Sequence, residues 1–318
     1  MIKWRDMPKH KNNLISTVGG WNAISFYSYC CWCIGHRWEE NTVDFCFGNP
    51  NILPKIIYVT THDFPFFYDN IYPNLNHRYY LLIVDHDYTV PNQIDTRFNY
   101  NPIKIEQWNN IVENKNIIHI FVSHLDIPAT DKFSPFPVGF NPHEHPNKNP
   151  DYILNIQVDY NILYRPLIMK GCCRIRDDQT NQGTQWNDRI KVRDLCKNSW
   201  SNISEWSNIP KHQFYYEIQK YSFLLCPHGG GIEPNPKVFS AIYCGTIPII
   251  KRFVNCEILY ADLPIVIIED WNEELITIDN LRDWREKYAH FFIDQDKRRK
   301  VLHKLTAKYW LDFIFSKS

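Results

Sequence analysis

The sequence lacks both a net charge and a hydrophobic run long enough to cross a membrane. Its 35 basic and 35 acidic residues balance to a formal net charge of zero. That balance gives no electrostatic reason for binding nucleic acid or an anionic membrane surface. No window reaches the ~18 apolar residues that a membrane span needs, and residues 1–6 do not begin a signal peptide. We therefore expect a cytoplasmic protein without a nucleic-acid partner.

The sequence also lacks a complete zinc motif. Among its 10 cysteines, residues 30–33 form one CxxC, with His36 and Cys46 nearby. A structural zinc site needs four ligands, and no second CxxC or spaced histidine pair supplies them. His143 and His145 stand in a Pro-rich run typical of a solvated loop. We expect most cysteines to be small buried hydrophobic residues, and no metal site at either place.

The most informative stretch is residues 221–250. Residues 223–226 form an apolar run typical of a buried strand, and the glycines at 229–231 end it. Residues 237–244 are expected to form a helix that begins at a lysine, and residues 247–250 the next buried strand. Strand, glycine loop, helix with a cation at its start and then strand is how α/β proteins hold a phosphate.

Strands and helices alternate through the rest of the chain. Further strands are expected at residues 55–60, 79–84, 117–122, 167–173 and 265–268, and helices at 64–72, 103–108, 186–196, 214–220 and 279–292. This alternation predicts doubly wound α/β domains, and 318 residues suffice for two of them. Because residues 141–151 are polar and rich in Pro and Asn, we place the domains at 1–150 and 151–293. Residues 294–318 follow as a C-terminal segment, helical from 296 to 315.

Several motifs resemble those of exostosin-like glycosyltransferases. The family pattern is a strand, Pro-Arg-Gly-x-Gly, an acid, Arg-x-Trp-Glu-Ala and Gly-x-Ile-Pro-Ile. Residues 227–233, 237–241 and 245–249 follow this pattern, and residues 259–271, 304–310, 85–88 and 135–139 extend it. The resemblance implies a GT-B-like fold: two doubly wound Rossmann-like domains facing a cleft, with a C-terminal helix crossing back to the first. It also implies a nucleotide-sugar donor bound by the second domain and an acceptor bound by the first.

The resemblance and the glycine loop together point to a set of donor-binding residues. The departing diphosphate needs backbone N–H groups and cationic side chains to neutralise it. The residues expected to contact the donor are Arg174, Arg189, His228, Gly229, Gly230, Gly231, Glu233, Lys237 and Ser240. Lys237 stands where the family has arginine, and Ser240 where it has a glutamate that binds ribose. The alternatives are a solvated helix lysine at 237 and an N-cap at Glu233.

Three residues at expected strand ends in the first domain are candidates for the catalytic base. They are Asp87, Asp85 and His62. Asp87 leads because it matches the family's aspartate before a tyrosine. The alternative is a metal-bound mechanism, in which Asp85 and Asp87 bridge Mg²⁺ or Mn²⁺ to the diphosphate.

The sequence therefore predicts a metal-independent, inverting glycosyltransferase that uses a nucleotide sugar, with a UDP-sugar favoured, and a glycan or glycoprotein acceptor. The alternative from another class is a non-catalytic nucleotide-sugar or glycan-binding protein. Ser240 in place of the family's glutamate is the main argument for that alternative.

Overall fold

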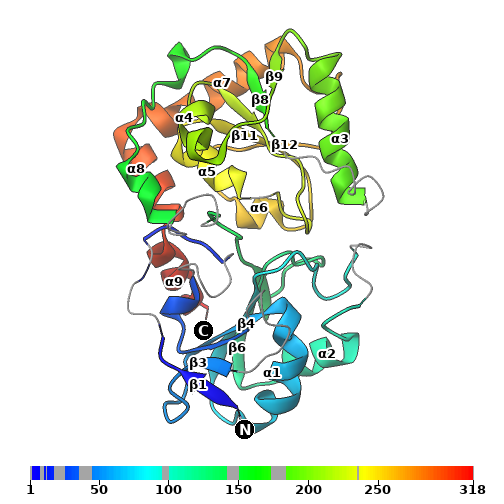
Figure 1. The fold of residues 1–318 in the computed structure, drawn as a ribbon, viewed down its shortest axis with the longest axis vertical. Coiled ribbons are helices and arrows are strands. Elements are labelled where there is room, and N and C mark those ends of the chain that lie inside the picture. The colour runs from blue at the N-terminus through cyan, green and yellow to red at the C-terminus, as the bar shows by residue number, and fades with distance from the viewer. Residues whose placement is uncertain are drawn as a thin grey trace. The chain divides into compact units, whose positions relative to one another are not determined.

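The chain folds into two compact α/β units (Figure 1). Unit 1 comprises residues 1–150 and 307–318, and unit 2 comprises residues 151–306. The computed structural model describes residues 2–7, 11, 13–17, 26–35, 45–94, 100–141, 150–172, 184–234 and 236–317.

Unit 1 is built on a mainly parallel sheet with the strand order β1-β3-β2-β4-β5-β6-β7, in which only the β2–β3 pair is antiparallel. The strands are β1 (Lys3–Arg5), β2 (Trp32–Ile34), β3 (Phe45–Gly48), β4 (Ile56–Thr60), β5 (Tyr79–Val84), β6 (Ile117–Val122) and β7 (Phe133–Pro135). The helices are α1 (Phe64–Asn70), α2 (Ile105–Glu113) and α9 (Ala307–Phe315). β4 and β5 are buried along their whole length, which explains why they read as continuous apolar runs.

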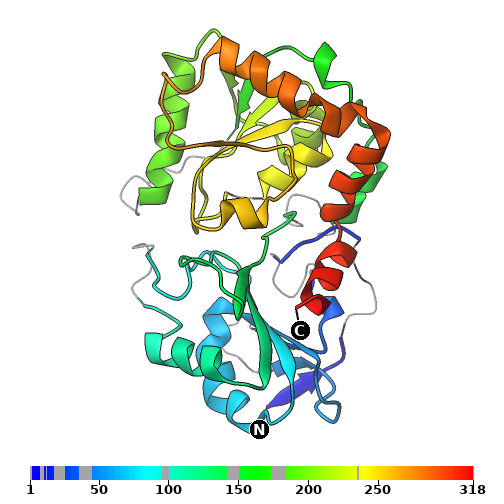
Figure 2. The same cartoon turned by 180° about the vertical axis from the view of Figure 1, so that it is seen from behind.

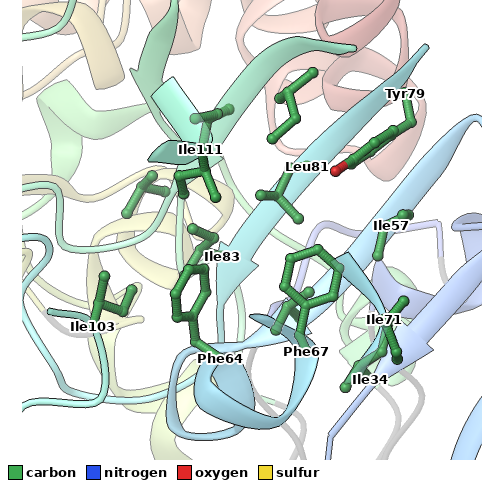
Figure 3. Packing of buried hydrophobic residues seen from close by; sticks show 14 of the residues in the cluster. Ile34, Ile57, Phe64, Phe67, Ile71, Tyr79, Leu81, Ile83, Ile103 and Ile111 are labelled. Atoms are coloured by element: carbon green, nitrogen blue, oxygen red, sulfur yellow. The ribbon is translucent and has the colours of Figure 1, made fainter. Parts of the chain in front are cut away.

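The core of unit 1 lies between the sheet and helices α1 and α2. Phe64 and Phe67 of α1 pack against Leu81 and Ile83 of β5, together with Ile111 of α2 (Figure 3). Each buried side chain of this size contributes about 1.5–3 kcal/mol to the free energy of folding. Because side chains alternate between the two faces of a strand, the even-numbered residues of β5 face the other way.

Helix α9 covers that opposite face of the unit 1 sheet. Tyr80 of β5 meets the ring of Phe315, and its hydroxyl donates a 2.7 Å hydrogen bond to the carbonyl of Lys317. Trp310 contacts Phe136 with ring centroids 5.4 Å apart. The prediction that the C-terminal helix returns to the first domain is therefore confirmed.

The prediction of one continuous helix from 296 to 315 is wrong. Helix α8 (Gln295–Lys304) belongs to unit 2. Leu305 and Thr306 then interrupt the helical structure before α9 begins. The hydroxyl of Thr306 donates to the carbonyl of His303 at 2.7 Å, which satisfies an acceptor in the last turn of α8. The apolar pattern continues on both sides of this short break, so periodicity alone did not reveal it.

Unit 2 is built on an all-parallel sheet with the strand order β12-β11-β10-β8-β9. The strands are β8 (Met169–Gly171), β9 (Ser204–Trp206), β10 (Phe223–Leu225), β11 (Ile247–Lys251) and β12 (Val266–Ile268). The helices are α3 (Thr184–Lys197), α4 (Phe214–Ile218), α5 (Lys237–Tyr243), α6 (Cys256–Leu259), α7 (Ile278–Ile293) and α8. In Figures 1 and 2, α7 lies across one face of this sheet and α4 and α5 lie across the other.

Both units are thus Rossmann-like, and the predicted GT-B-like fold class is confirmed at this level. Strand β9 was missed because residues 204–206 are polar and partly exposed at the sheet edge. The short 3-10 helices span Phe26–Tyr29, Thr61–Asp63, Tyr72–Asn74, Pro150–Asn155, Ile162–Tyr164 and Lys211–Gln213. Within the described residues, no helix has the length and apolar character needed to cross a bilayer.

Candidate functional site

The glycine loop follows β10 at the carboxyl end of the unit 2 sheet. The backbone N–H of Cys226 still pairs with the carbonyl of Ile249 in β11, at 2.9 Å. Beyond it the chain turns back on itself, because His228 and Pro234 form an antiparallel bridge. The three glycines at 229–231 lie inside this closed loop and are buried. The predicted loop therefore exists, and the bridge fixes its base.

Helix α3 holds the loop from one side. Arg189 donates from Nε to the carbonyl oxygen of His228, 3.0 Å away. The preceding residue, Asp188, is buried and places Oδ2 3.6 Å from Nδ1 of the His228 ring. Two consecutive residues of α3 therefore meet the backbone and the side chain of the same loop histidine. Asp188 was not predicted as a site residue, because no sequence motif distinguishes it from the other polar residues of α3.

An ion-pair network joins the ends of β11 and β12 to α3. Lys251, at the end of β11, lies 3.1 Å from Oδ1 of Asp188 and 3.4 Å from Oδ1 of Asp270. Lys191 of α3 lies 2.7 Å from Oδ2 of Asp270, and this hydrogen bond lowers the pKa of the Asp270 carboxyl. We call His228, Asp188, Lys251, Asp270 and Lys191 the edge cluster. It brings five titratable groups to the edge of the sheet where ligands bind in such folds.

Lys237 begins α5 and reaches the end of a different strand. Its Nζ donates to the carbonyl oxygen of Cys172, which directly follows β8, at 3.1 Å. The lysine is half-buried. Helix α5 is one residue shorter than expected and ends at Tyr243.

Glu233 and Ser240 have partners inside unit 2. The hydroxyl of Tyr260 donates to Oε1 of Glu233 at 3.2 Å, and Glu233 is 3 % exposed. Burial, followed by the Glu233 carboxylate, raises the pKa of Tyr260. Ser240 is fully buried, with its hydroxyl 3.1 Å from that of Tyr215. The geometry gives no support to donor contact by Ser240, and Arg174 lies outside the described residues.

The three candidate bases lie at one edge of the unit 1 sheet. His62 follows β4, and Asp85 and Asp87 follow the neighbouring strand β5. Asp85 is buried and has a positive φ of 59°, which is uncommon for a residue other than glycine, whereas Asp87 is exposed. Nδ1 of His62 lies 3.3 Å from the hydroxyl of Tyr88. The three residues therefore lie at the same end of the sheet, and the two aspartates differ in that Asp85 is buried and Asp87 is exposed.

Around His62 the rings form a cluster that the sequence analysis missed. His86 and Tyr100 lie 5.3 and 6.0 Å from His62 between ring centroids, and Tyr88 lies 6.1 Å away. Burial raises the pKa of Tyr88 and of Tyr100. Tyr100 comes from a distant part of the sequence, and no local pattern connects it to His62.

Within the described residues, no three His, Cys, Asp or Glu side chains lie close enough together to hold a metal ion. His143 and His145 lie outside those residues. The nine cysteines that the structure describes are free thiols, most of them buried.

No protein-family profile and no curated protein sequence matches the chain. Among solved structures, it is similar to sucrose-phosphate synthase from Thermosynechococcus elongatus, with 10% identity, a TM-score of 0.42, and coverage of 83% of this chain and 74% of that one. HepE from Anabaena in complex with UDP-glucose shows 9% identity and a TM-score of 0.41, with coverage of 83% and 78%. An alpha1,3-fucosyltransferase shows 12% identity and a TM-score of 0.37, with coverage of 97% and 90%. At TM-scores this low, the likenesses carry no argument about the activity of this chain.

Proposed function

We propose that this protein is a glycosyltransferase that moves a sugar from a nucleotide sugar, with a UDP-sugar favoured, to a hydroxyl of a glycan or glycoprotein. The observation that carries the proposal is the segment from β10 to β11. It places a closed glycine loop and Lys237 at the carboxyl end of a parallel sheet, where α/β folds bind nucleotides. The motif resemblance through the same residues supports the choice of a nucleotide sugar.

The diphosphate of the donor would bind at the glycine loop and Lys237. In the structure, the Lys237 ammonium donates to the neutral carbonyl of Cys172. Replacing that neutral acceptor by a phosphate oxygen strengthens the hydrogen bond, because bonds between charged groups are the stronger kind. Lys237 would then neutralise the charge that develops on the leaving diphosphate. The proposed reaction is metal-independent because this cation and the loop amides take that role.

The acceptor hydroxyl would lose its proton to a base of unit 1. We favour Asp87, because it is an exposed residue and matches the aspartate before a tyrosine in the resembled family, with Asp85 and His62 as alternatives. Asp85 is buried, and the His62 ring already contacts the Tyr88 hydroxyl. Direct attack of the activated hydroxyl on the donor sugar would invert the anomeric configuration. An Asp87→Asn variant should retain donor affinity and lose turnover by 10²-fold or more, the usual scale for a general base.

Calorimetry with UDP in the presence of EDTA tests the donor site. Lys237→Ala should weaken UDP binding by about 1.5–3 kcal/mol, the range for a hydrogen bond to a charged group. Lys220→Ala is the matched control, since Lys220 is an exposed lysine of the same unit that pairs with Glu217. Unchanged UDP affinity in Lys237→Ala, or loss of wild-type binding in EDTA, would refute the assignment.

The second candidate function is a non-catalytic nucleotide-sugar or glycan-binding protein. The fully buried Ser240, where the resembled family has a ribose-binding glutamate, is the observation that favours it. Incubation with UDP-sugars and a panel of glycan acceptors separates the two. The transferase releases UDP and forms a new glycoside, whereas the binding protein gives a calorimetric signal without product.

A further inference from the structure

Unit 2 contains a pocket at the place where helix α7 ends and α8 begins (Figure 1). Its volume is about 340 Å³. Its lining residues are Val158, Asp159, Tyr160, Asn161, Ile293 and Arg298. Pockets that bind small molecules have volumes of roughly 300–1,000 Å³. The pocket is therefore large enough to hold one small ligand or one group of a larger ligand.

This pocket is separate from the proposed donor site. The hydroxyl of Tyr160 donates to the carbonyl oxygen of Tyr243, the last residue of α5, at 3.0 Å. Lys237, which belongs to the donor site, is the first residue of the same helix. At about 1.5 Å per residue, the two ends of α5 lie about 9 Å apart. The donor loop lies at the carboxyl end of the unit 2 sheet, whereas Tyr243 shortly precedes the start of β11, so the pocket lies toward the amino end.

Arg298 presents hydrogen-bond donors to this pocket. Its guanidinium carbon lies 4.8 Å from the centre of the Tyr160 ring, and its Nη1 donates to the carbonyl oxygen of Phe292 at 2.7 Å. These two contacts hold the guanidinium in place. Within the described residues, Nε and Nη2 make no hydrogen bond, the cation forms no ion pair, and both nitrogens are accessible to solvent. A ligand in the pocket can therefore accept hydrogen bonds from Arg298.

The segment before β8 supplies acceptors to the same pocket. Oδ1 of Asp159 accepts the backbone N–H of Asn161 at 2.9 Å, and its other carboxylate oxygen has no partner in the described part of the chain. The side-chain amide of Asn161 makes no hydrogen bond to a described residue. Asp159 and Arg298 carry opposite charges and line one pocket, yet they form no ion pair with each other. A ligand that contacts both must donate to the carboxylate and accept from the guanidinium.

A neutral sugar residue meets these requirements. Each of its hydroxyl groups both donates and accepts hydrogen bonds, so neighbouring hydroxyls can bridge a guanidinium and a carboxylate. The C–H groups of its ring can pack on Val158 and Ile293, of which Ile293 is 43 % exposed. An anion would be repelled by Asp159, and a cation would be repelled by Arg298. Because Asp159 and Ile293 are exposed, further sugars of a chain can extend from the pocket into solvent.

We propose that this pocket binds one sugar residue of a neutral glycan, as a carbohydrate site apart from the donor site. Arg298 donates to hydroxyl oxygens of the sugar, and Asp159 accepts from its hydroxyl groups. In the proposed transferase, the site would hold a glycan chain at a distance from the reacting hydroxyl. The site itself rests on the pocket and its lining residues, and it does not depend on the proposed function.

An array of neutral and acidic oligosaccharides, probed with the full chain, tests the site. Calorimetry then measures the neutral oligosaccharide that binds best. Arg298→Leu removes the donors and should weaken its binding about 10- to 100-fold, the range for hydrogen bonds to a charged group. Arg299→Leu is the matched control, because Arg299 is the next residue of α8, is exposed and pairs with Asp296; it should leave the affinity unchanged. No binding of a neutral oligosaccharide to the wild type, or equal affinities of Arg298→Leu and the wild type, would overturn the proposal.

A second variant separates a neutral sugar from an anion, and its result stands even if Arg298→Leu lowers stability. Asp159→Asn keeps an oxygen for the backbone N–H of Asn161 but removes the negative charge. It should weaken binding of the neutral oligosaccharide about 3- to 10-fold, because the hydrogen bond loses its charge. Tighter binding in Asp159→Asn, or a preference of the wild type for acidic oligosaccharides, would show an anion site and overturn the proposal.

Calorimetry with UDP distinguishes this inference from the proposed function. Arg298→Leu should bind UDP as the wild type does, because the donor site lies at the other end of α5. Binding of the neutral oligosaccharide without any binding of UDP would support the carbohydrate site and overturn the donor assignment. Binding of UDP without binding of a neutral oligosaccharide would overturn the carbohydrate site and leave the donor assignment standing.

Discussion

Replacing Trp310 by alanine should lower the stability of unit 1 and leave the stability of unit 2 unchanged. Trp310 lies on α9, more than 150 residues after the rest of unit 1, yet it is only 5 % exposed. Its ring meets Phe136 at 5.4 Å and Phe313 at the same distance. The helix therefore fills part of the unit 1 core, and the deletion would leave a cavity against Phe136.

The size of the effect follows from the burial. Truncation of a buried tryptophan to alanine costs about 3–5 kcal/mol. That is a large share of the roughly 5–15 kcal/mol by which domains are stable. Since about 1.4 kcal/mol corresponds to a factor of ten, opened forms of unit 1 should become about 10²–10⁴ times more populated.

Hydrogen exchange measured by mass spectrometry resolves the two units separately. Peptides from β4 and β5 should exchange faster in Trp310→Ala, whereas peptides from β10 and β11 should not change. Lys308→Ala is the control on the same helix, because Lys308 is exposed and makes an i,i+4 ion pair with Asp312. Such a pair contributes about 0.5 kcal/mol or less. Uniform acceleration in both units, or equal effects of the two variants, would refute the assignment of α9 to unit 1.

Two further predictions concern stability. Gly245→Ala should destabilise unit 2 by about 1–3 kcal/mol in denaturant titrations, because Gly245 has a φ of 71° and a Cβ there would lie 2.9 Å from Nη2 of Arg165; an unchanged midpoint would contradict this. Burial and then the Lys317 ammonium lower the pKa of His119 from 6.5 to about 4. The unfolded chain binds the proton first, so unit 1 should lose up to about 3 kcal/mol as the pH falls from 6.5 to 4. His119→Gln should lack that part of the pH dependence, and an identical profile would count against it.

Most of the fold could be predicted from the sequence because its strands are buried on both faces. The sequences of β4, β5, β6 and β11 are mainly apolar along their length. Such runs are typical of strands in a parallel sheet that is covered on both faces. Strands β1, β2, β3 and β7 of unit 1 are only three or four residues long and were not predicted. The edge strand β9 was also missed, because it is partly exposed and carries polar residues.

The candidate site was only partly predictable. Loop residues such as His228 were found because glycine and proline mark a loop by local chemistry alone. Asp188 was missed, since its role depends on where α3 packs and not on its neighbours in the sequence. Ser240 shows the converse: its place in the motif suggested a ligand contact, but the fold buries its hydroxyl against Tyr215.

The most direct test of the donor site is a crystal structure of the protein with UDP-glucose, grown without divalent cations. The diphosphate should lie at the glycine loop, with the Lys237 ammonium and backbone N–H groups of residues 229–231 within hydrogen-bonding distance. A diphosphate bound elsewhere in the chain, or bound at the loop only through an added metal ion, would contradict the account.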